Sequence, residues 1–212
     1  AAAVRMSATR LAIFPLTGAL LYPGLRLPLH IFEPRYRELV GHALARDRRI
    51  AMIQPQRPED GAPLYSVGCV GKIEDVEASE DGRYNILLAG ESRFRLLREL
   101  EVTTPYRQIE AELFAEPAEE VLSFGERAAF EHESRKFADA QGYAIDWDSV
   151  ARLDDVALIN GVSQIAPFDT AAKQALLEAP DLRVRCDLLV QLMEFFGKGD
   201  PVAVDHSCIP SA

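Results

Sequence analysis

The stretch from residue 15 to residue 37 constrains the fold of this chain most, because short apolar runs alternate there with proline and glycine. The runs at 11–16, 19–22 and 25–32 are too short for helices and too apolar for solvated loops. Proline is tolerated in a sheet mainly at edges, strand starts and bulges. We therefore expect short, strongly bent strands packed on a core, with turns at residues 17–18 and 23–24.

A helix is expected to follow directly, because the pattern changes after Phe32. Pro34 suits the first helical turn, where its missing N–H is no loss. Apolar side chains then recur at three- and four-residue spacing, as on the buried face of a helix: Tyr36, Leu39, Val40, Ala43 and Leu44.

The sequence from residue 50 to residue 114 is β-rich. A short apolar strand at 50–54 and an exposed loop at 55–63 come first. The glycines between 67 and 76 predict a bend or bulge, and Asp81-Gly82 predicts a hairpin turn. A second turn is expected at 90–92, between strands at 84–89 and 93–97. In the last strand, Ile109, Ala111 and Leu113 are expected to face inward and Gln108, Glu110 and Glu112 outward.

Beyond residue 116 the chain reads as helical. A long helix is expected from about 118 to 140, ended by Gly142, with a connector or short helix at 144–152. Asp154 or Asp155 should cap a helix with the apolar face Val156, Ile159, Val162, Ile165 and Ala166. Asp169 should cap a short helix, and a last helix should start at 180–181 and run to 196. Residues 197–212 have no periodicity and predict a flexible tail.

Charge and cysteine content exclude several classes of protein. The net charge is −10, which disfavours nucleic acid as a partner because phosphate-binding surfaces are basic. No apolar stretch approaches a membrane span, and the N-terminus lacks a secretory pattern, with Met6 as the expected natural start after a cloning remnant at 1–5. The three cysteines form no C-x-x-C pair, so we expect neither disulfides nor zinc, and a cytoplasmic location.

Known catalytic motifs are absent. There is no G-x-x-x-x-G-K-[ST] phosphate loop, and residues 90–94 have Phe94 where a G-x-S-x-G motif needs its second glycine. The histidines His30, His42, His132 and His206 lie at no metal-ligand spacing and are expected to be structural or on the surface. We therefore expect no catalytic residues, no metal and no cofactor.

Several motifs recur together along the chain. The most specific is the run at 28–37, Pro-Leu-His-Ile-Phe-Glu-Pro-Arg-Tyr-Arg, after Tyr22-Pro23-Gly24. Others are Val67-Gly68 with Gly71-Lys72-Ile73, Asp81-Gly82-Arg83, Arg93-Phe94, Pro105-Tyr106, and Pro167-Phe168-Asp169 before Lys173-Gln174 and Leu176-Leu177-Glu178. Over residues 10–196 the sequence resembles the N-terminal substrate-binding domain of the ATP-dependent protease Lon. Phe168, Asp169 and Ala172 depart from the family's usual Leu, Ser and Glu, but Asp169 can cap alone.

The resemblance implies an α+β architecture: a PUA-like β-barrel domain over 10–115, followed by a helical bundle over 116–196 and the tail at 197–212. It implies a non-catalytic binding module for peptides or for unfolded or misfolded protein, acting in protein quality control, alone or with a protease or chaperone partner. Full-length Lon continues with an ATPase module and a protease domain with a serine–lysine dyad. With no phosphate loop here, we expect a stand-alone Lon-domain protein that is not an enzyme.

The expected binding residues gather at the strand-to-helix corner and on one strand: Phe32, Glu33, Pro34, Arg35, Tyr36, Arg93 and Phe94. Phe32, Pro34 and Tyr36 would either line an apolar groove for a peptide or simply fix the corner, and Glu33 and Arg35 are expected to form a local ion pair. Exposed edge strands offer a second mode, in which a peptide adds as a further strand. The alternative function is an RNA-binding PUA-like protein, in which Arg93 and Arg95 flank Phe94 to clamp a single strand. A hydrolase with an unrecognised site is the least favoured.

Overall fold

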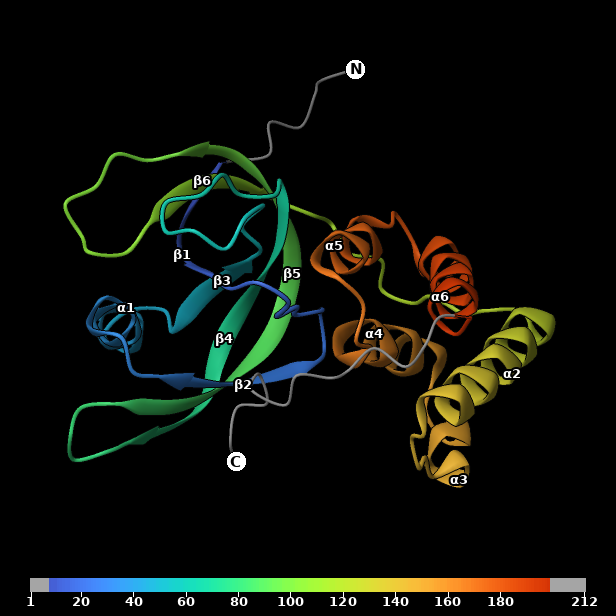
Figure 1. The fold of residues 1–212 in the computed structure, drawn as a ribbon. Helices are drawn as coiled ribbons and strands as arrows, with labels where there is room; N and C mark the ends of the chain where they lie inside the picture. Colours follow the sequence, from blue (N-terminus) through green and yellow to red (C-terminus); the bar gives the residue numbers. More distant parts are fainter. Residues whose placement is uncertain (1–7, 199–212) are drawn as a thin grey trace, which may run out of the picture. The chain divides into compact units, whose positions relative to one another are not determined.

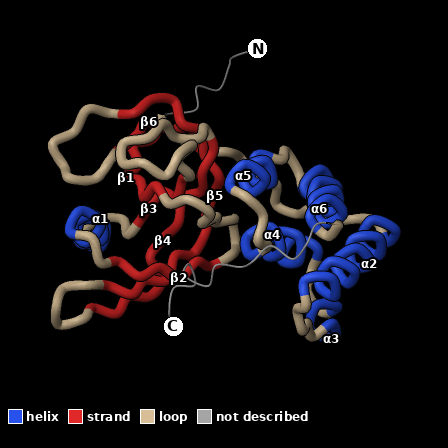
Figure 2. Tube along the Cα trace, in the orientation of Figure 1, coloured by secondary structure: helices blue, strands red, loops and turns tan. Residues whose placement is uncertain are grey.

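The chain, in a computed structural model that describes residues 8–198, is an α+β protein with one mixed sheet and six helices (Figures 1 and 2). The strands are β1 (Thr9–Pro15), β2 (Arg26–Ile31), β3 (Arg49–Ile53), β4 (Val67–Ala78), β5 (Tyr84–Glu99) and β6 (Gln108–Leu113). The helices are α1 (Pro34–Leu44), α2 (Phe124–Gln141), α3 (Trp147–Ala151), α4 (Asp155–Ile165), α5 (Thr170–Glu178) and α6 (Leu182–Phe196). The expectations for residues 1–6, His206, Cys208 and most of the tail lie outside the described residues.

Two compact units divide between Glu116 and Pro117. The N-terminal unit holds all six strands and α1, and the C-terminal unit holds α2 to α6. Apart from α1, the helices therefore all follow residue 116, and all six strands precede it.

The strand pairings of the N-terminal unit form a ring. The sheet order is β2-β5-β4-β3-β1-β6, and β5 also pairs with β6. β1 and β3 are parallel, and the other pairs are antiparallel. The ring closes on β5, because its residues 84–89 pair with β2, its residues 94–99 with β6, and its residues 84–95 with β4. β2 is attached outside the ring.

The turn expected at 90–92 does not form, because β5 runs without a break through these residues. Gly90 serves a close approach instead. A Cβ built on Gly90 would lie 2.0 Å from the carbonyl oxygen of Tyr22, so no side chain fits there. The backbone N–H of Gly90 donates to the Leu25 oxygen, and its own oxygen accepts from Gly24. A register shift in the β4–β5 ladder falls beside it, at Val70 and Gly71, where a bulge is predicted.

The run at 19–22 is buried but is not a strand. Gly18 and Gly24, with φ of 76° and 78°, form the two expected turns on either side of it. Leu20, Leu21 and Tyr22 are almost completely buried. The apolar pattern thus identifies core residues correctly and their backbone conformation incorrectly.

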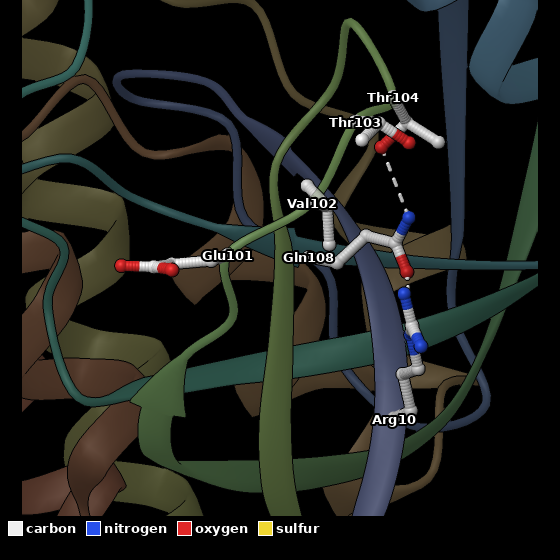
Figure 3. Close-up of a pocket in the computed structure, with 6 residues that line it drawn as sticks. All are labelled: Arg10, Glu101, Val102, Thr103, Thr104 and Gln108. Atoms are coloured by element: carbon white, nitrogen blue, oxygen red, sulfur yellow. Dashed lines mark hydrogen bonds between the residues drawn. The ribbon is translucent and has the colours of Figure 1, made fainter.

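The segment between β5 and β6 is held by a row of polar side chains (Figure 3). Arg10 Nε donates to Gln108 Oε1 at 2.7 Å, and Gln108 Nε2 donates to Thr104 Oγ1 at 3.0 Å. Gln108, which strand alternation places outward, is buried instead. Its amide is satisfied on both sides, which removes the cost of burying a polar group.

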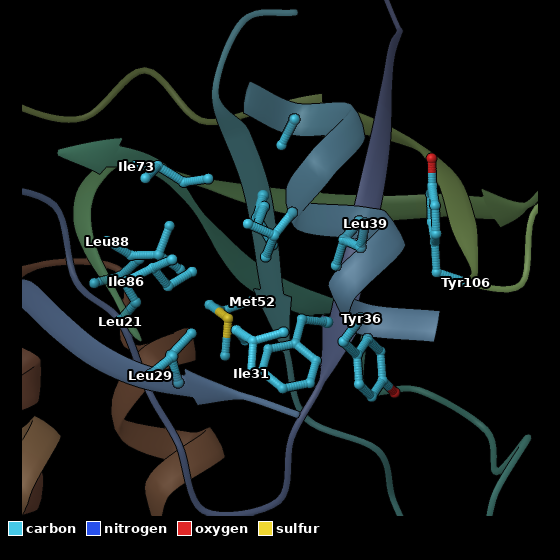
Figure 4. Packing of buried hydrophobic residues seen from close by; sticks show 14 of the residues in the cluster. Leu21, Leu29, Ile31, Tyr36, Leu39, Met52, Ile73, Ile86, Leu88 and Tyr106 are labelled. Carbon is cyan, nitrogen blue, oxygen red and sulfur yellow. The ribbon is translucent and has the colours of Figure 1, made fainter. Parts of the chain in front are cut away.

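β3 is buried on both faces. Ile50 and Met52 belong to one apolar cluster and Ala51 and Ile53 to another, as expected where successive side chains point to opposite faces. The first cluster includes the buried face of α1, namely Tyr36, Leu39, Val40 and Ala43 (Figure 4). The periodicity after Pro34 therefore predicts the helix and its buried face correctly.

The helices of the C-terminal unit begin where their caps predict. Asp154, Asp169 and Asp181 each accept a hydrogen bond from the backbone three residues on, and Gly142 ends α2 with φ of 75°. α2 begins at Phe124, later than expected, because Ser123 is its N-cap and forms a capping box with Glu126. A further difference is Ile165, expected on the buried face of α4 but 79% exposed.

A buried arginine connects three elements of the C-terminal unit. Arg185, in α6, is 3% exposed. Its guanidinium donates to Asn160 Oδ1 at 2.7 Å, to the Leu176 oxygen at 2.9 Å and to the Ala179 oxygen at 3.2 Å. The last two oxygens belong to the C-terminal end of α5, where the final carbonyls lack the regular bond from four residues on, although the Leu176 oxygen also accepts from the Ala179 N–H at 3.4 Å. Arg185 thus acts as the cap of α5.

Candidate functional site

β2 has an open edge. It pairs with β5 from Arg26 to Ile31, and no other strand in the described part of the chain pairs with its opposite side. Pro28 lies in the middle of this strand, a position that proline tolerates on edge strands because it lacks the N–H of a ladder. The side chains of Leu29 and Ile31 point into the core. β2 therefore presents backbone N–H and C=O groups beside a firmly packed inner face.

An exposed aromatic pair lies at the end of this edge. Phe32, the residue after β2, is 56% exposed. Its ring stacks on that of His30, with 5.8 Å between ring centroids. His30 is positioned by its Nδ1, 2.6 Å from Oδ1 of Asn85, its cross-strand partner on β5. Because the amide oxygen only accepts, the histidine donates here.

The corner that follows is fixed by charges. Arg35 contacts Glu33 at 3.0 Å and Asp60 at 2.6 Å, so the predicted ion pair forms and extends to a third residue. The hydrogen bond from Arg35 lowers the pKa of the Asp60 carboxyl. Tyr36 is buried below, with its ring 4.3 Å from that of Phe14, and burial raises the pKa of its hydroxyl. Glu33, Arg35 and Tyr36 thus hold the corner, whereas Pro34 is exposed beside Phe32.

Arg93 and Phe94 lie elsewhere, on opposite faces of β5, and both are buried. Phe94 is completely buried, and a Cβ on Gly68 would lie 2.5 Å from its ring. The guanidinium of Arg93 is buried too and contacts Glu116 at 3.0 Å. Tyr84, the partner of Ile31, is ten residues before Phe94 on β5, or roughly 30 Å of strand. The structure therefore does not join these two residues to the Phe32 corner, and neither offers an exposed clamp.

Other kinds of site are not evident in residues 8–198. No group of three or more His, Cys, Asp or Glu side chains within that range is arranged to hold a metal ion. None of the helices described is long and apolar enough to cross a membrane. The geometry of the Phe32 corner, with an open strand edge and exposed rings, suits contact with a chain molecule more than enclosure of a small one.

Residues 10–194 match the family model of the ATP-dependent protease La (LON) substrate-binding domain. The chain belongs to this family. The resemblance read from the run at 28–37 is thereby confirmed. Lon protease 2 of Syntrophobacter fumaroxidans is 27% identical over 82% of this chain and 23% of that protein. Lon protease 2 of Sorangium cellulosum is 27% identical over 85% of this chain and 24% of that protein. The chain spans about a quarter of the length of these Lon relatives.

Two solved structures share the Lon N-terminal domain fold. A Lon N-terminal domain protein from Xanthomonas campestris has a TM-score of 0.67 at 22% identity, over 86% of this chain and 98% of that one. The N-terminal domain of a Mycobacterium avium complex Lon protease has a TM-score of 0.64 at 21% identity, over 88% of this chain and 98% of that one. The α+β class and the Lon N-terminal domain fold expected from the sequence are therefore observed.

Proposed function

We propose that this chain is a non-catalytic recognition module that binds extended or unfolded segments of protein substrates. Its family is the substrate-binding domain of a protease, which supports protein substrates as the ligand class. The observation that carries the proposal is the open edge of β2 ending at the exposed ring of Phe32. Backbone groups of an edge strand pair with any extended peptide, because they do not depend on its side chains.

The proposed site has two parts with different tasks. The edge of β2 supplies main-chain hydrogen bonds along an added strand. Phe32, with His30 stacked on it and Pro34 beside it, supplies an apolar contact at the end of that strand. Glu33 and Arg35 satisfy each other, so they hold the corner in place and leave the ligand contact to the rings.

Replacing Phe32 by alanine is expected to weaken binding of unstructured peptides about tenfold, the cost of truncating one aromatic anchor. The fold should survive, because the side chain is 56% exposed. Fluorescence anisotropy with a labelled, unfolded peptide rich in Val and Leu measures the dissociation constant. Phe195→Ala is the matched control, since Phe195 is 73% exposed in the C-terminal unit and should leave the constant unchanged.

Strand addition is tested by removing backbone donors from the ligand. N-methylation of alternate residues of the same peptide on its pairing edge should abolish binding, whereas methylation of the other residues should not. Equal binding of both methylated peptides would disprove strand addition. Retarded migration of single-stranded RNA, with affinity that falls steeply with salt, would favour the RNA-binding alternative instead.

We propose that a protease or chaperone partner acts on the bound segment. A reducing, cytoplasmic setting suits the two described cysteines, Cys69 and Cys186, because both are buried thiols. Burial raises the pKa of Cys186 to about 11, which keeps it protonated and unreactive.

The architecture is proposed in finer terms as well. We infer that the ring of strand pairings is a PUA-like barrel spanning residues 10–115, with β2 as an added edge strand. We further infer that the helices between residues 116 and 196 form a bundle around the apolar cluster centred on Phe130, Ile159 and Leu189.

A further inference from the structure

A groove in the N-terminal unit combines an apolar floor with a basic rim. It has a volume of about 280 Å³ and lies between α1, with its exit turn, and the strands β1 and β6. Leu39 and Ala43 of α1 form part of its floor, and Arg10, Arg46 and Arg49 are among its lining residues. A second hollow, of about 360 Å³, shares Arg10 and Gln108 with it (Figure 3).

Two of these arginines lack the carboxylate that arginines in this unit usually have. Between residues 8 and 116, eight of the thirteen arginines form ion pairs. Arg46 forms none with any described residue, and Arg10 Nε donates to the neutral amide of Gln108. Glu110, the cross-strand partner of Arg10, is paired with Arg98 at 2.5 Å. Two guanidinium groups without a carboxylate partner among the described residues therefore line one groove. This is unexpected in a chain whose net charge is −10.

The other charged residues at the groove do not cancel the positive charge of Arg10 and Arg46. Arg49 is paired with Glu91 at 2.6 Å and lies 3.9 Å from Asp47, the acidic residue of the lining. His42 lies 3.8 Å from Glu38, outside the lining, on the same face of α1. Asp47 therefore opposes three arginines, one of which already has a partner.

The walls of the groove are preorganised. Arg10 is held by Gln108, and Gln108 by Thr104, whose hydroxyl donates to the Tyr106 oxygen at 2.8 Å. The Tyr106 hydroxyl in turn lies 2.7 Å from Nδ1 of His42. This row connects β1, β6 and α1 and holds Arg10 in place before a ligand binds, which lowers the ordering entropy lost on that side of the groove.

The turn that carries Arg46 is fixed by an unusual backbone. Arg48 has φ of 64°, a left-handed conformation that side chains other than glycine rarely adopt. Its N–H donates to the Ala43 oxygen at 2.8 Å, its oxygen accepts from Ile73, and its Nε donates to the Ile73 oxygen. These hydrogen bonds attach the turn to α1 and β4, and Arg46 and Arg49 on either side of Arg48 line the groove.

We propose that this groove is a carboxylate-binding subsite for peptide ligands, which takes the side chain of an acidic residue or a free C-terminus. Two guanidiniums suit a carboxylate, and the apolar floor suits the methylenes or the neighbouring side chain that come with it. A polyanion such as RNA is disfavoured by the overall negative charge. This inference rests on the proposed function, because it gives the bound peptide a charged anchor away from the edge of β2.

The test uses ligands too short to add as a strand. Acetyl-Leu-Glu-amide is titrated into the protein while the arginine Nε–H signals are followed by ¹H–¹⁵N NMR. Saturable shifts are expected for Arg10 and Arg46, with a dissociation constant of about 1 mM for so small a ligand. Acetyl-Leu-Gln-amide, which lacks the charge, should shift neither signal. The free acid acetyl-Leu-Leu distinguishes a terminal carboxylate from a side-chain one.

Substitution supplies the second readout. The double variant R10Q/R46Q should bind acetyl-Leu-Glu-amide at least about tenfold more weakly, the loss expected for charge-assisted hydrogen bonds. R57Q/R83Q removes the same charge from two exposed arginines outside the groove, at 66% and 50% side-chain exposure, and should bind like the parent. Circular dichroism of both variants checks that they are folded.

Any one of four results would contradict the proposal of a carboxylate-binding subsite. They are the absence of shifts with either carboxylate ligand, equal shifts with the glutamine peptide, equal losses in both double variants, or tighter binding of inorganic phosphate or of a short RNA. Because the dipeptides do not reach along β2, failure here leaves the Phe32→Ala result standing. Failure of the Phe32→Ala prediction likewise leaves the NMR titration interpretable.

Discussion

Replacing Gly90 by alanine is expected to lower the free energy of unfolding of the N-terminal unit by about 3 kcal/mol, which shifts its folding equilibrium about a hundredfold. The added Cβ would lie 2.0 Å from the Tyr22 oxygen and 2.7 Å from the Tyr22 carbonyl carbon. These are backbone atoms, so no change of rotamer relieves the clash. The segment at 21–25 must move away from β5, and the hydrogen bonds that Gly90 makes with Gly24 and Leu25 weaken as it does.

Urea denaturation followed by far-ultraviolet circular dichroism measures this effect. Gly41→Ala is the matched control, because Gly41 lies inside α1 and a Cβ there meets nothing within 4 Å. That substitution should stabilise by about 0.5–1 kcal/mol, since alanine favours helix over glycine. A Gly90→Ala protein as stable as its parent would show that the 21–25 segment does not lie against β5 as described.

Replacing Arg185 by methionine is expected to cost about 3 kcal/mol of stability in the C-terminal unit. Methionine fills much of the same volume but donates no hydrogen bond, so Asn160 Oδ1 and the oxygens of Leu176 and Ala179 lose a donor. A buried acceptor that loses a donor costs about 1–3 kcal/mol, offset in part by removal of a buried charge and, at the Leu176 oxygen, by the bond it keeps from the Ala179 N–H at 3.4 Å. The urea midpoint should fall by about 1–3 M.

The single tryptophan, Trp147 of α3, reports on this unit through its fluorescence. Arg183→Met is the matched control two residues away on α6. Arg183 is 65% exposed and pairs with Glu126 at the surface, so its loss should cost less than about 1 kcal/mol. If both variants lose the same stability, the buried hydrogen bonds of Arg185 are not what caps α5.

Local chemistry allowed much of the fold to be predicted. Asp154, Asp169 and Gly142 mark helix ends because a cap depends on its own side chain or backbone freedom and on neighbours within four residues. The face of α1 follows from spacing alone. The sequence does not show whether a glycine forms a turn or allows a close approach of another backbone segment. Gly90 allows a close approach, by a segment some seventy residues earlier in the chain.

The same limit applies to the candidate site. Phe32 and Pro34 were identifiable because they lie within the motif at 28–37, and both are exposed. Phe94 is expected among the binding residues because flanking arginines are typical of an exposed basic–aromatic strand, whereas Phe94 is completely buried and Arg93 is buried against Glu116. The groove could not be predicted from the sequence, because only the packing of α1 on the sheet brings Arg10 and Arg46 to the same groove. Neither residue lies in a local motif that indicates this.

The pairing of β1 with β6 has a consequence for synthesis of the protein. Thr9 pairs with Ala111, about 100 residues further along, and β3, the other neighbour of β1, begins only at Arg49. At about 5–20 residues per second, a ribosome needs roughly 5–20 s to make that interval. Throughout this time the side of β1 that pairs with β6 has no partner, so an apolar strand edge of the nascent chain stays open to other contacts.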